Sequence, residues 1–110
     1  INLRAIMIAD TADFGILRII TDDSDKALSV LKDAKFTTKT TDVLAISISD
    51  KVGALHDVMA LFQNNGINIE YLYASLEKTG DTAIIIFKVQ DADKGLKVIE
   101  ENGLSTVGKF

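Results

Sequence analysis

Apolar and polar residues change their spacing along this chain, and each change indicates a new element of secondary structure. From Val43 to Ser49, apolar residues alternate with small or polar ones, which is typical of a half-buried strand. The apolar residues from Leu55 to Phe62 instead follow helical intervals, and Asn64 to Gly66 supplies a helix stop. Residues 67–76 and 82–90 return to strand-like spacing, and we expect them to form a hairpin.

A second helix completes this half of the chain. It is expected to begin after Asp91 and to stop at Asn102 and Gly103, and the tail from Leu104 is expected to add a short strand. The order is therefore strand, helix, strand, strand, helix, strand. This order is typical of an α+β, ferredoxin-like βαββαβ fold, in which both helices lie on one face of an antiparallel sheet.

An internal repeat extends this interpretation to the first half. Residues 1–37 match residues 67–105 at nearly constant spacing. The expected elements of the first copy are strands at Ile1–Ala9 and Phe14–Thr21, a helix at Ser24–Ala34 and a closing strand at Phe36–Thr41. Since it has no counterpart of residues 43–66, we expect such a segment to precede it. The predicted domains are an incomplete repeat over residues 1–42 and a second repeat over residues 43–110.

Composition narrows the possible partners. Apolar residues make up 47% of the 110 residues and the net charge is −4, which favours a globular domain and disfavours nucleic acid as a partner. No apolar run reaches the roughly 18 to 20 residues that span a bilayer, and no basic leader is present. The chain has no cysteine, so it forms neither disulfides nor a thiolate metal site. These features predict a cytoplasmic protein without a membrane partner.

The chain lacks the residues that three other functions of this fold require. An RNA-binding version would carry aromatic residues on its central strands, where this chain has apolar residues such as Ile46 and Ile84. A metal-carrying version would need paired Cys or a His cluster. An enzyme would need a nucleophile or an acid–base pair, and the single histidine, His56, has no evident partner. We therefore predict no catalytic residue, no metal and no cofactor.

The segment Asp50–Leu55 is the most informative part of the chain, because it joins a strand to a helix through a glycine. Gly53 allows the backbone to approach a small ligand closely. The helix that follows begins with unpaired N–H groups, which suit a carboxylate. The loop can therefore hold an anion without a charged side chain.

These residues resemble a known family. The Asp-x-x-Gly-x-Leu loop at Asp50–Leu55, with Gly-Ile-Asn-Ile at Gly66–Ile69, resembles the ACT domain, a regulatory module that binds amino acids. The repeat, with Ile8–Asp10 and Asp13–Arg18 in its first copy, is similar to small free-standing bacterial proteins made of two ACT domains. One departure is Val52, because the family usually has Pro there and the loop loses a fixed dihedral angle.

The resemblance implies a ligand site where two such domains meet. Family ligands are held by the Gly loop of one domain and by the Asn that opens the second strand of the other. Asn68 would face the loop of the first copy, which is absent, so one site is complete and one is not. The ligand-binding residues implied in this way are Asn2, Asp50, Lys51, Val52, Gly53, Ala54, Leu55 and Asn68.

Each of these residues also has a purely structural interpretation. Gly53 would serve a tight strand-to-helix turn, and Asp50 would be the N-cap of the helix. Asn2 and Asn68 would hydrogen-bond their own loops. Lys51 would be solvated, or would pair with a ligand carboxylate at the rim.

The strand patterns also indicate association. The run Ala83–Phe87, and Ile16–Leu17 together with Ile19–Ile20, are apolar on both faces, although a sheet with helices on one face should be polar on the other. Something must cover the second face, and a homodimer is the simplest prediction. Arg18 interrupts the otherwise apolar strand from Ile16 to Ile20, and an ion pair at an edge or interface would explain it.

The leading hypothesis is a non-catalytic, cytoplasmic tandem ACT protein that binds a small amino acid. Binding of the amino acid would change the packing of the two domains or their contact with a partner. This partner could be a metabolic enzyme. The alternative is a structural or interaction module that docks on a metabolic enzyme through its sheet and binds no ligand.

Overall fold

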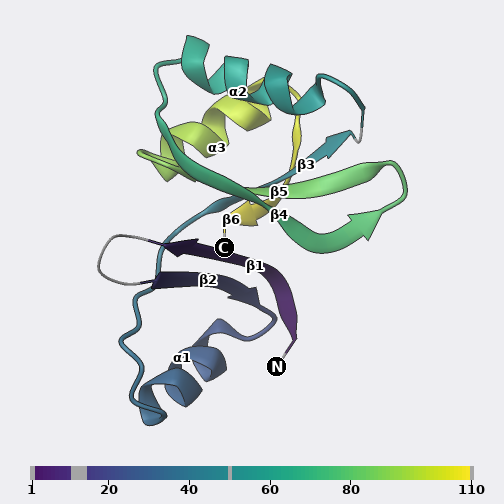
Figure 1. Cartoon of the computed structure of the whole chain (residues 1–110). Helices are drawn as coiled ribbons and strands as arrows, with labels where there is room; N and C mark the ends of the chain where they lie inside the picture. The colour runs from purple at the N-terminus through teal and green to yellow at the C-terminus, as the bar shows by residue number, and fades with distance from the viewer. Residues whose placement is uncertain (1, 11–14, 50, 110) are drawn as a thin grey trace.

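The computed structural model describes residues 2–10, 15–49 and 51–109 (Figure 1). The described helices and strands are, in chain order, β1 (Leu3–Asp10), β2 (Gly15–Thr21), α1 (Ser24–Asp33), β3 (Leu44–Ser49), α2 (Ala54–Asn64), β4 (Ile69–Thr79), β5 (Thr82–Val89), α3 (Ala92–Glu101) and β6 (Ser105–Lys109). Most of the expected elements are present, and their ends shift by only a few residues.

The strands form one antiparallel sheet in the order β2-β1-β4-β5-β3-β6. Strands β4, β5, β3 and β6 belong to the second half of the chain, and α2 and α3 cover one of their faces (Figure 1). This is the α+β, ferredoxin-like arrangement that the sequence predicts.

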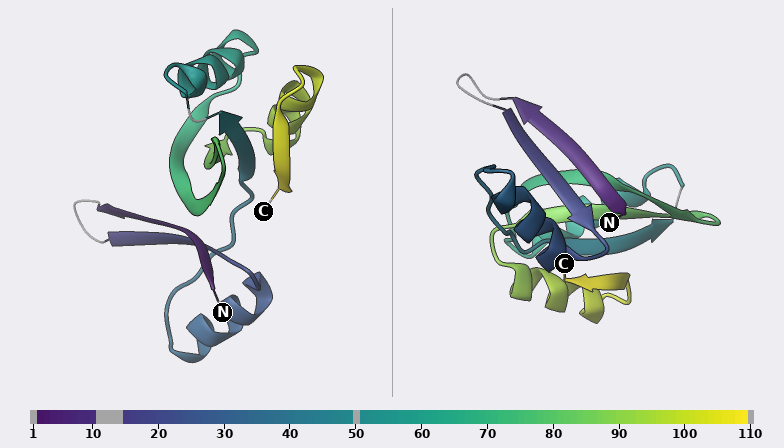
Figure 2. Two further views of the ribbon diagram at one scale, coloured as in Figure 1. Left: turned by 90° about the vertical axis from the view of Figure 1, so that its right-hand side faces the viewer. Right: turned by 90° about the horizontal axis from the view of Figure 1, so that it is seen from below.

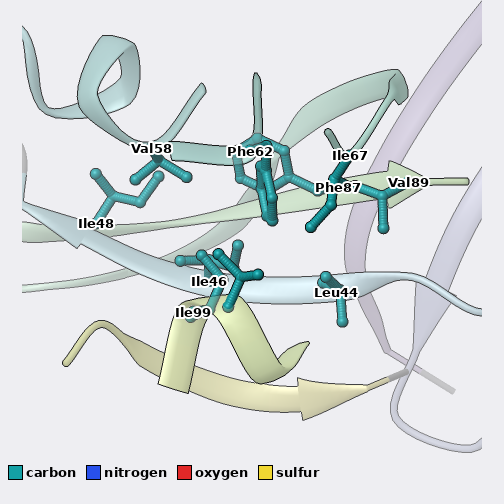
Figure 3. Packing of buried hydrophobic residues seen from close by; sticks show 10 residues of the cluster. Leu44, Ile46, Ile48, Val58, Phe62, Ile67, Phe87, Val89 and Ile99 are labelled. Atoms are coloured by element: carbon teal, nitrogen blue, oxygen red, sulfur yellow. The ribbon is translucent and has the colours of Figure 1, made fainter. Parts of the chain in front are cut away.

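The main core lies between this part of the sheet and its two helices (Figure 3). It forms because alternate residues of β3 and β5 point to the helical face and meet the apolar stripes of α2 and α3. Phe62 and Phe87 pack edge to face, with ring centroids 5.4 Å apart. The buried residues of this cluster are Leu44, Ile46, Ile48, Val58, Phe62, Ile67, Phe87, Val89, Val98 and Ile99.

The β1–β2 hairpin lies against the opposite, helix-free face of β3–β6, with α1 on its outer side (Figures 1 and 2). Where β1 runs beside β4, Ala5 pairs with Ser75, and the Ser75 hydroxyl donates to the Arg4 carbonyl at 2.7 Å. A second cluster fills the space between the layers, with Ala5, Val43, Ala45, Tyr73 and Ile86 buried in it. The chain therefore covers part of its own second face, for which the sequence predicted a second chain.

Arg18 lies in this second layer. Its guanidinium carbon is 4.1 Å from the ring centroid of Tyr71, a cation–π contact, and Tyr71 is stacked with Tyr73 at a centroid distance of 6.3 Å. The Nε atom of Arg18 is buried without a hydrogen-bond partner. The structure thus gives Arg18 an aromatic partner at the place where the sequence suggested an ion pair.

Burial raises the pKa of Tyr73 above its usual value, Tyr71 adds to the rise, and Arg18 opposes it. The folded protein therefore holds the phenol proton more tightly than the unfolded chain does. This contribution to stability is fully present below about pH 10 and is lost as the pH rises through the folded pKa. We expect Tyr73→Phe to lose less stability than the wild type above about pH 10, which urea unfolding at a series of pH values would measure. Parallel curves for the two proteins would contradict this expectation.

The expected closing strand at Phe36–Thr41 is not formed, because these residues have no regular secondary structure. In the second half, the corresponding strand β6 pairs with β3 alone. Among the described residues, the first half has no strand equivalent to β3. Phe36–Thr41 therefore has no neighbour with which to pair, and this prediction from sequence was wrong.

Helices α1 and α3 begin with the same cap. The Asp23 carboxylate accepts a hydrogen bond from the Lys26 N–H at 3.0 Å, and the Asp91 carboxylate accepts one from the Lys94 N–H at 3.1 Å. Each carboxylate satisfies a first-turn amide that has no partner within its helix. The predicted start of the helix after Asp91 is confirmed.

Candidate functional site

The turn between β3 and α2 is built around Gly53, which occupies the N-cap position with φ +88° and ψ −11°. Before the helix begins, the Ala54 N–H donates to the Lys51 carbonyl at 3.2 Å, and the Asp57 N–H then donates to the Gly53 carbonyl at 3.0 Å. A positive φ strains any residue that carries a Cβ, so this turn requires glycine. A Cβ added at Gly53 would find no heavy atom within 4 Å, so the space in front of the turn is open.

The start of α2 differs from those of α1 and α3. Asp23 and Asp91 cap α1 and α3 with a carboxylate, whereas Gly53 provides no side-chain hydrogen bond to the first turn of α2. The positive end of the α2 dipole therefore lacks a carboxylate from its own N-cap residue. An external carboxylate could take the place that an aspartate side chain fills in the other two helices.

The remaining loop residues surround this turn. Lys51, Val52 and Leu55 are exposed, and Ala54 is half-buried. Val52 and Leu55 give the rim an apolar character, while Lys51 supplies a cation beside it. Asp50 lies outside the described residues, and Gly53 holds the N-cap position that was predicted for Asp50.

Asn2 and Asn68 play the same backbone role in the two hairpins. The Asp22 N–H donates to the Asn2 carbonyl at 3.1 Å, and the Gln90 N–H donates to the Asn68 carbonyl at 3.0 Å. Both side chains are exposed, and neither forms a side-chain hydrogen bond within the described part of the chain. Their amides are therefore available to a ligand, and the interpretation that they bond their own loops finds no support there.

The structure brings the contiguous loop residues together but does not bring Asn2 to them. The N-terminal end of β1 lies below the β3–β6 layer, and α2 begins above it (Figures 1 and 2). Gly53 is the N-cap of α2, whereas Asn68 comes after its C-terminal end, so the two residues belong to opposite ends of this helix. The separation arises because the β1–β2 hairpin lies on the helix-free face of β3–β6. Its first residues therefore cannot reach the side on which α2 and α3 lie.

The structure has two hollows that the sequence did not predict. The larger, of about 660 Å³, surrounds Asn68 and the start of α3, and its lining includes Gly66, Gln90, Asp91 and Lys94. Its polar lining comes from segments far apart in the sequence. The only available signal was the position of Asn68 just after a helix stop and that of Asp91 at a helix start.

The smaller hollow, of about 320 Å³, lies along α2 and is mostly apolar. Ala54, which the sequence placed in the ligand site, is part of its lining together with Ile48, Val58 and Leu61. It therefore offers an apolar surface next to the first turn of α2. No pattern in the sequence singled it out, because its lining comes from β3, α2 and the residues that follow α3.

Within the residues described, no group of three or more His, Asp or Glu side chains could hold a metal ion. His56 is exposed in the first turn of α2. None of the described helices is both long and apolar enough to cross a membrane.

These features define an α+β domain of the ferredoxin-like class with an open, glycine-capped helix start. The chain belongs to the ACT domain pair family, whose model matches residues 1–109, and the resemblance stated from the sequence is thereby confirmed. Membership of this family indicates a regulatory module that binds small molecules.

A solved structure supports the same assignment. The crystal structure of protein BT0572 from Bacteroides thetaiotaomicron is similar to this chain, with a TM-score of 0.88 and 38% sequence identity. The similarity covers 96% of this chain and 72% of that one. A comparison with curated proteins found no match.

Proposed function

We propose that this protein binds a small amino acid at the Gly53 turn and acts as a non-catalytic regulatory module. The observation that carries the proposal is the start of α2, where a left-handed glycine stands in place of a capping side chain and faces open space. The ACT family assignment supports the same class of function.

The proposed contacts follow from the groups at the turn. The ligand carboxylate accepts hydrogen bonds from first-turn N–H groups of α2, where the helix dipole favours negative charge. Backbone carbonyls near Gly53 accept from the ligand ammonium, and the Asn2 amide completes the polar shell. Val52 and Leu55 contact the ligand side chain, and Asp50 and Lys51 lie at the rim. Asn68 belongs to a second, incomplete site.

We also propose that the chain contains two ACT-type repeats, over residues 1–42 and 43–110. The matched caps of α1 and α3 support this division, as do the equivalent backbone bonds at Asn2 and Asn68. The helix ends agree as well, because Lys35 and Gly103 both have a positive φ, of 67° and 71°. Lys35 is an unusual residue at such an angle, so its agreement with Gly103 is strong support for a repeat.

Binding is proposed to change the packing of the two repeats. Asn2 can join the Gly53 site only if the β1–β2 hairpin moves from under the β3–β6 layer toward its edge. Such a movement breaks the pairing of Ala5 in β1 with Ser75 in β4 and the hydrogen bond that the Ser75 hydroxyl donates to the Arg4 carbonyl. It would expose Tyr73 of the second cluster. Ligand binding would thus be signalled to a partner through the surface that the β1–β2 hairpin now covers.

A screen of the twenty amino acids tests the proposal. A ligand at a hundred times its Kd stabilises the folded protein by about 2.7 kcal/mol, so thermal unfolding should shift upward for one or two of the twenty. Calorimetry should then show weaker binding in Asn2→Ala. Asn64→Ala serves as the control, because Asn64 is an exposed residue at the end of α2 outside the proposed site. No response to any amino acid would contradict the proposal.

The second candidate is an interaction module that docks on a metabolic enzyme through its sheet. It is favoured by the exposed apolar side chains on the outer face of β1–β2, which include Ile8 and Leu17. In that case the Gly53 turn would remain empty and the amino acid screen would be silent. A homodimer located in the cytoplasm remains part of both proposals.

A further inference from the structure

The smaller hollow opens beside the Gly53 turn. Its lining includes Ser49, which precedes the turn, and Ala54, which follows it. A ligand held at the turn therefore has this hollow next to it. The hollow has a volume of about 320 Å³, which lies at the lower end of the range of about 300–1,000 Å³ for small-molecule pockets.

Aliphatic side chains of the main core form the apolar part of this lining. Ile48 and Val58 are 6% and 3% exposed and lie next to each other at one end of the cluster (Figure 3). Leu61 and Leu104 are half-buried and pack against the same cluster, so part of their apolar surface still meets water. Carbon atoms that fill the hollow would remove this surface from water, which is favourable.

One face of α2 leads from the Gly53 turn into the hollow. Four residues of the helix line the hollow, and they are Ala54, Asp57, Val58 and Leu61. Residues three or four positions apart are neighbours on a helix surface, so these four share one face. From the turn onward, this face presents first the amides of the helix start, then the Asp57 carboxylate and then an apolar surface.

The polar groups at the start of this face lack partners within the described part of the chain. There, neither the Leu55 N–H nor the His56 N–H donates a hydrogen bond, and the Asp57 carboxylate forms no hydrogen bond or ion pair. An amino acid carries a carboxylate, which accepts from N–H groups, and an ammonium group, which donates to a carboxylate. It therefore suits both kinds of group at once.

We propose that the ligand is an aliphatic amino acid of the size of valine, leucine or isoleucine, and that its side chain fills this hollow. This inference rests on the proposed function and names the class of ligand for the same site. The ligand carboxylate accepts from the Leu55 and His56 N–H groups, and the ligand ammonium pairs with the Asp57 carboxylate. The side chain passes Leu55 at the rim and packs on the apolar lining.

The hollow selects against other classes of amino acid. Val58 lies about one helical turn beyond Ala54, or about 5.4 Å along the axis, and the side chains of glycine and serine have too few atoms to cross this distance. They would leave the apolar lining in contact with water. A charged side chain would lose its hydration in a hollow whose lining is mostly apolar.

The first test is calorimetry of the unmodified protein with glycine, alanine, valine and leucine. Affinity should rise along this series, by at least about tenfold from alanine to leucine, because each methylene buried in an apolar pocket strengthens binding. Glycine binding as tightly as leucine would overturn the proposal and leave the proposed function intact. No response to any amino acid would overturn both.

The variant Leu61→Phe tests the hollow directly, because it adds carbon atoms to the lining. Leucine affinity should fall by at least about tenfold, whereas alanine affinity should stay within about twofold. Met59→Phe is the matched control, since Met59 lies in the same helix, is 40% exposed and lies outside the lining of the hollow. Thermal unfolding without ligand shows whether both variants fold. Equal leucine affinity in the two folded variants would contradict the proposal.

The variant Asp57→Asn tests how the ligand is oriented and does not alter the core. Leucine affinity should fall by at least about tenfold, because a charge-assisted hydrogen bond to the ammonium is weakened. The hydroxy acid analogue of leucine lacks the ammonium and should bind the variant and the wild type alike. Asp25→Asn is the control, since Asp25 lies in the first turn of α1. An equal loss for leucine and its analogue would mean that Asp57 acts only on the helix start, and it would overturn the proposed orientation.

Discussion

Replacing Phe62 by alanine is expected to lower the free energy of unfolding by about 3–5 kcal/mol. Phe62 is fully buried, packs edge to face with Phe87 and lies at the centre of the core between α2 and the sheet (Figure 3). The substitution removes the apolar contacts of the ring and leaves a cavity that rigid neighbours cannot fill. Because a domain of this size has a total stability of about 5–15 kcal/mol, a large part of it would be lost.

Urea unfolding followed by circular dichroism would measure this effect. Met59→Ala is a suitable control in the same helix, since Met59 is partly exposed. We expect a loss of no more than about 1 kcal/mol there, as less apolar surface leaves the core. A similar loss in both variants would mean that the packing of α2, rather than the Phe62–Phe87 contact, limits stability.

Gly53→Val is expected to abolish the upward shift in unfolding temperature caused by the amino acid ligand. A β-branched residue at a φ of +88° costs roughly 1–2 kcal/mol, so the turn should relax to another conformation. The Cβ itself meets no protein atom, so the loss of binding would come from the altered turn and from side-chain atoms that fill the open space. Calorimetry with the ligand identified in the screen measures this directly.

Gly80→Val is the matched control for this experiment. Gly80 also has a positive φ, of 57°, and no heavy atom within 4 Å of an added Cβ, but it lies at the turn between β4 and β5. The variant should lose a similar amount of stability through backbone strain and still bind the ligand. Binding that is weakened equally in both variants would show that general destabilisation, and not the Gly53 turn, controls affinity.

Local patterns in the sequence predicted most of the secondary structure correctly. Alternation predicted β3, helical intervals predicted α2, and Asp91 marked the start of α3, which its carboxylate caps through the Lys94 N–H. The Gly53 turn was recognised in the same way. Each of these features depends on residues within a few positions of one another, and their spacing is visible in the chain itself.

The arrangement of the two halves was not visible in this way. The sequence predicted that Asn2 would meet the Gly53 loop, but the structure separates them by a layer of sheet. It also predicted a strand at Phe36–Thr41, which has the right residues but no neighbouring strand. In both cases the result depends on which segment from a distant part of the chain lies beside the residues in question. The local pattern of residues does not contain this information.

The sequence by itself determined the order of the elements, the family and the glycine at the start of α2. Only the tertiary structure decided that the β1–β2 hairpin lies on the helix-free face, where Ala5 and Tyr73 are buried together, and that Ile8 and Leu17 on its outer face stay exposed. The physical reason is that local hydrogen bonding and periodicity fix each element, whereas apolar faces and strand edges bind whichever complementary surface the rest of the fold presents.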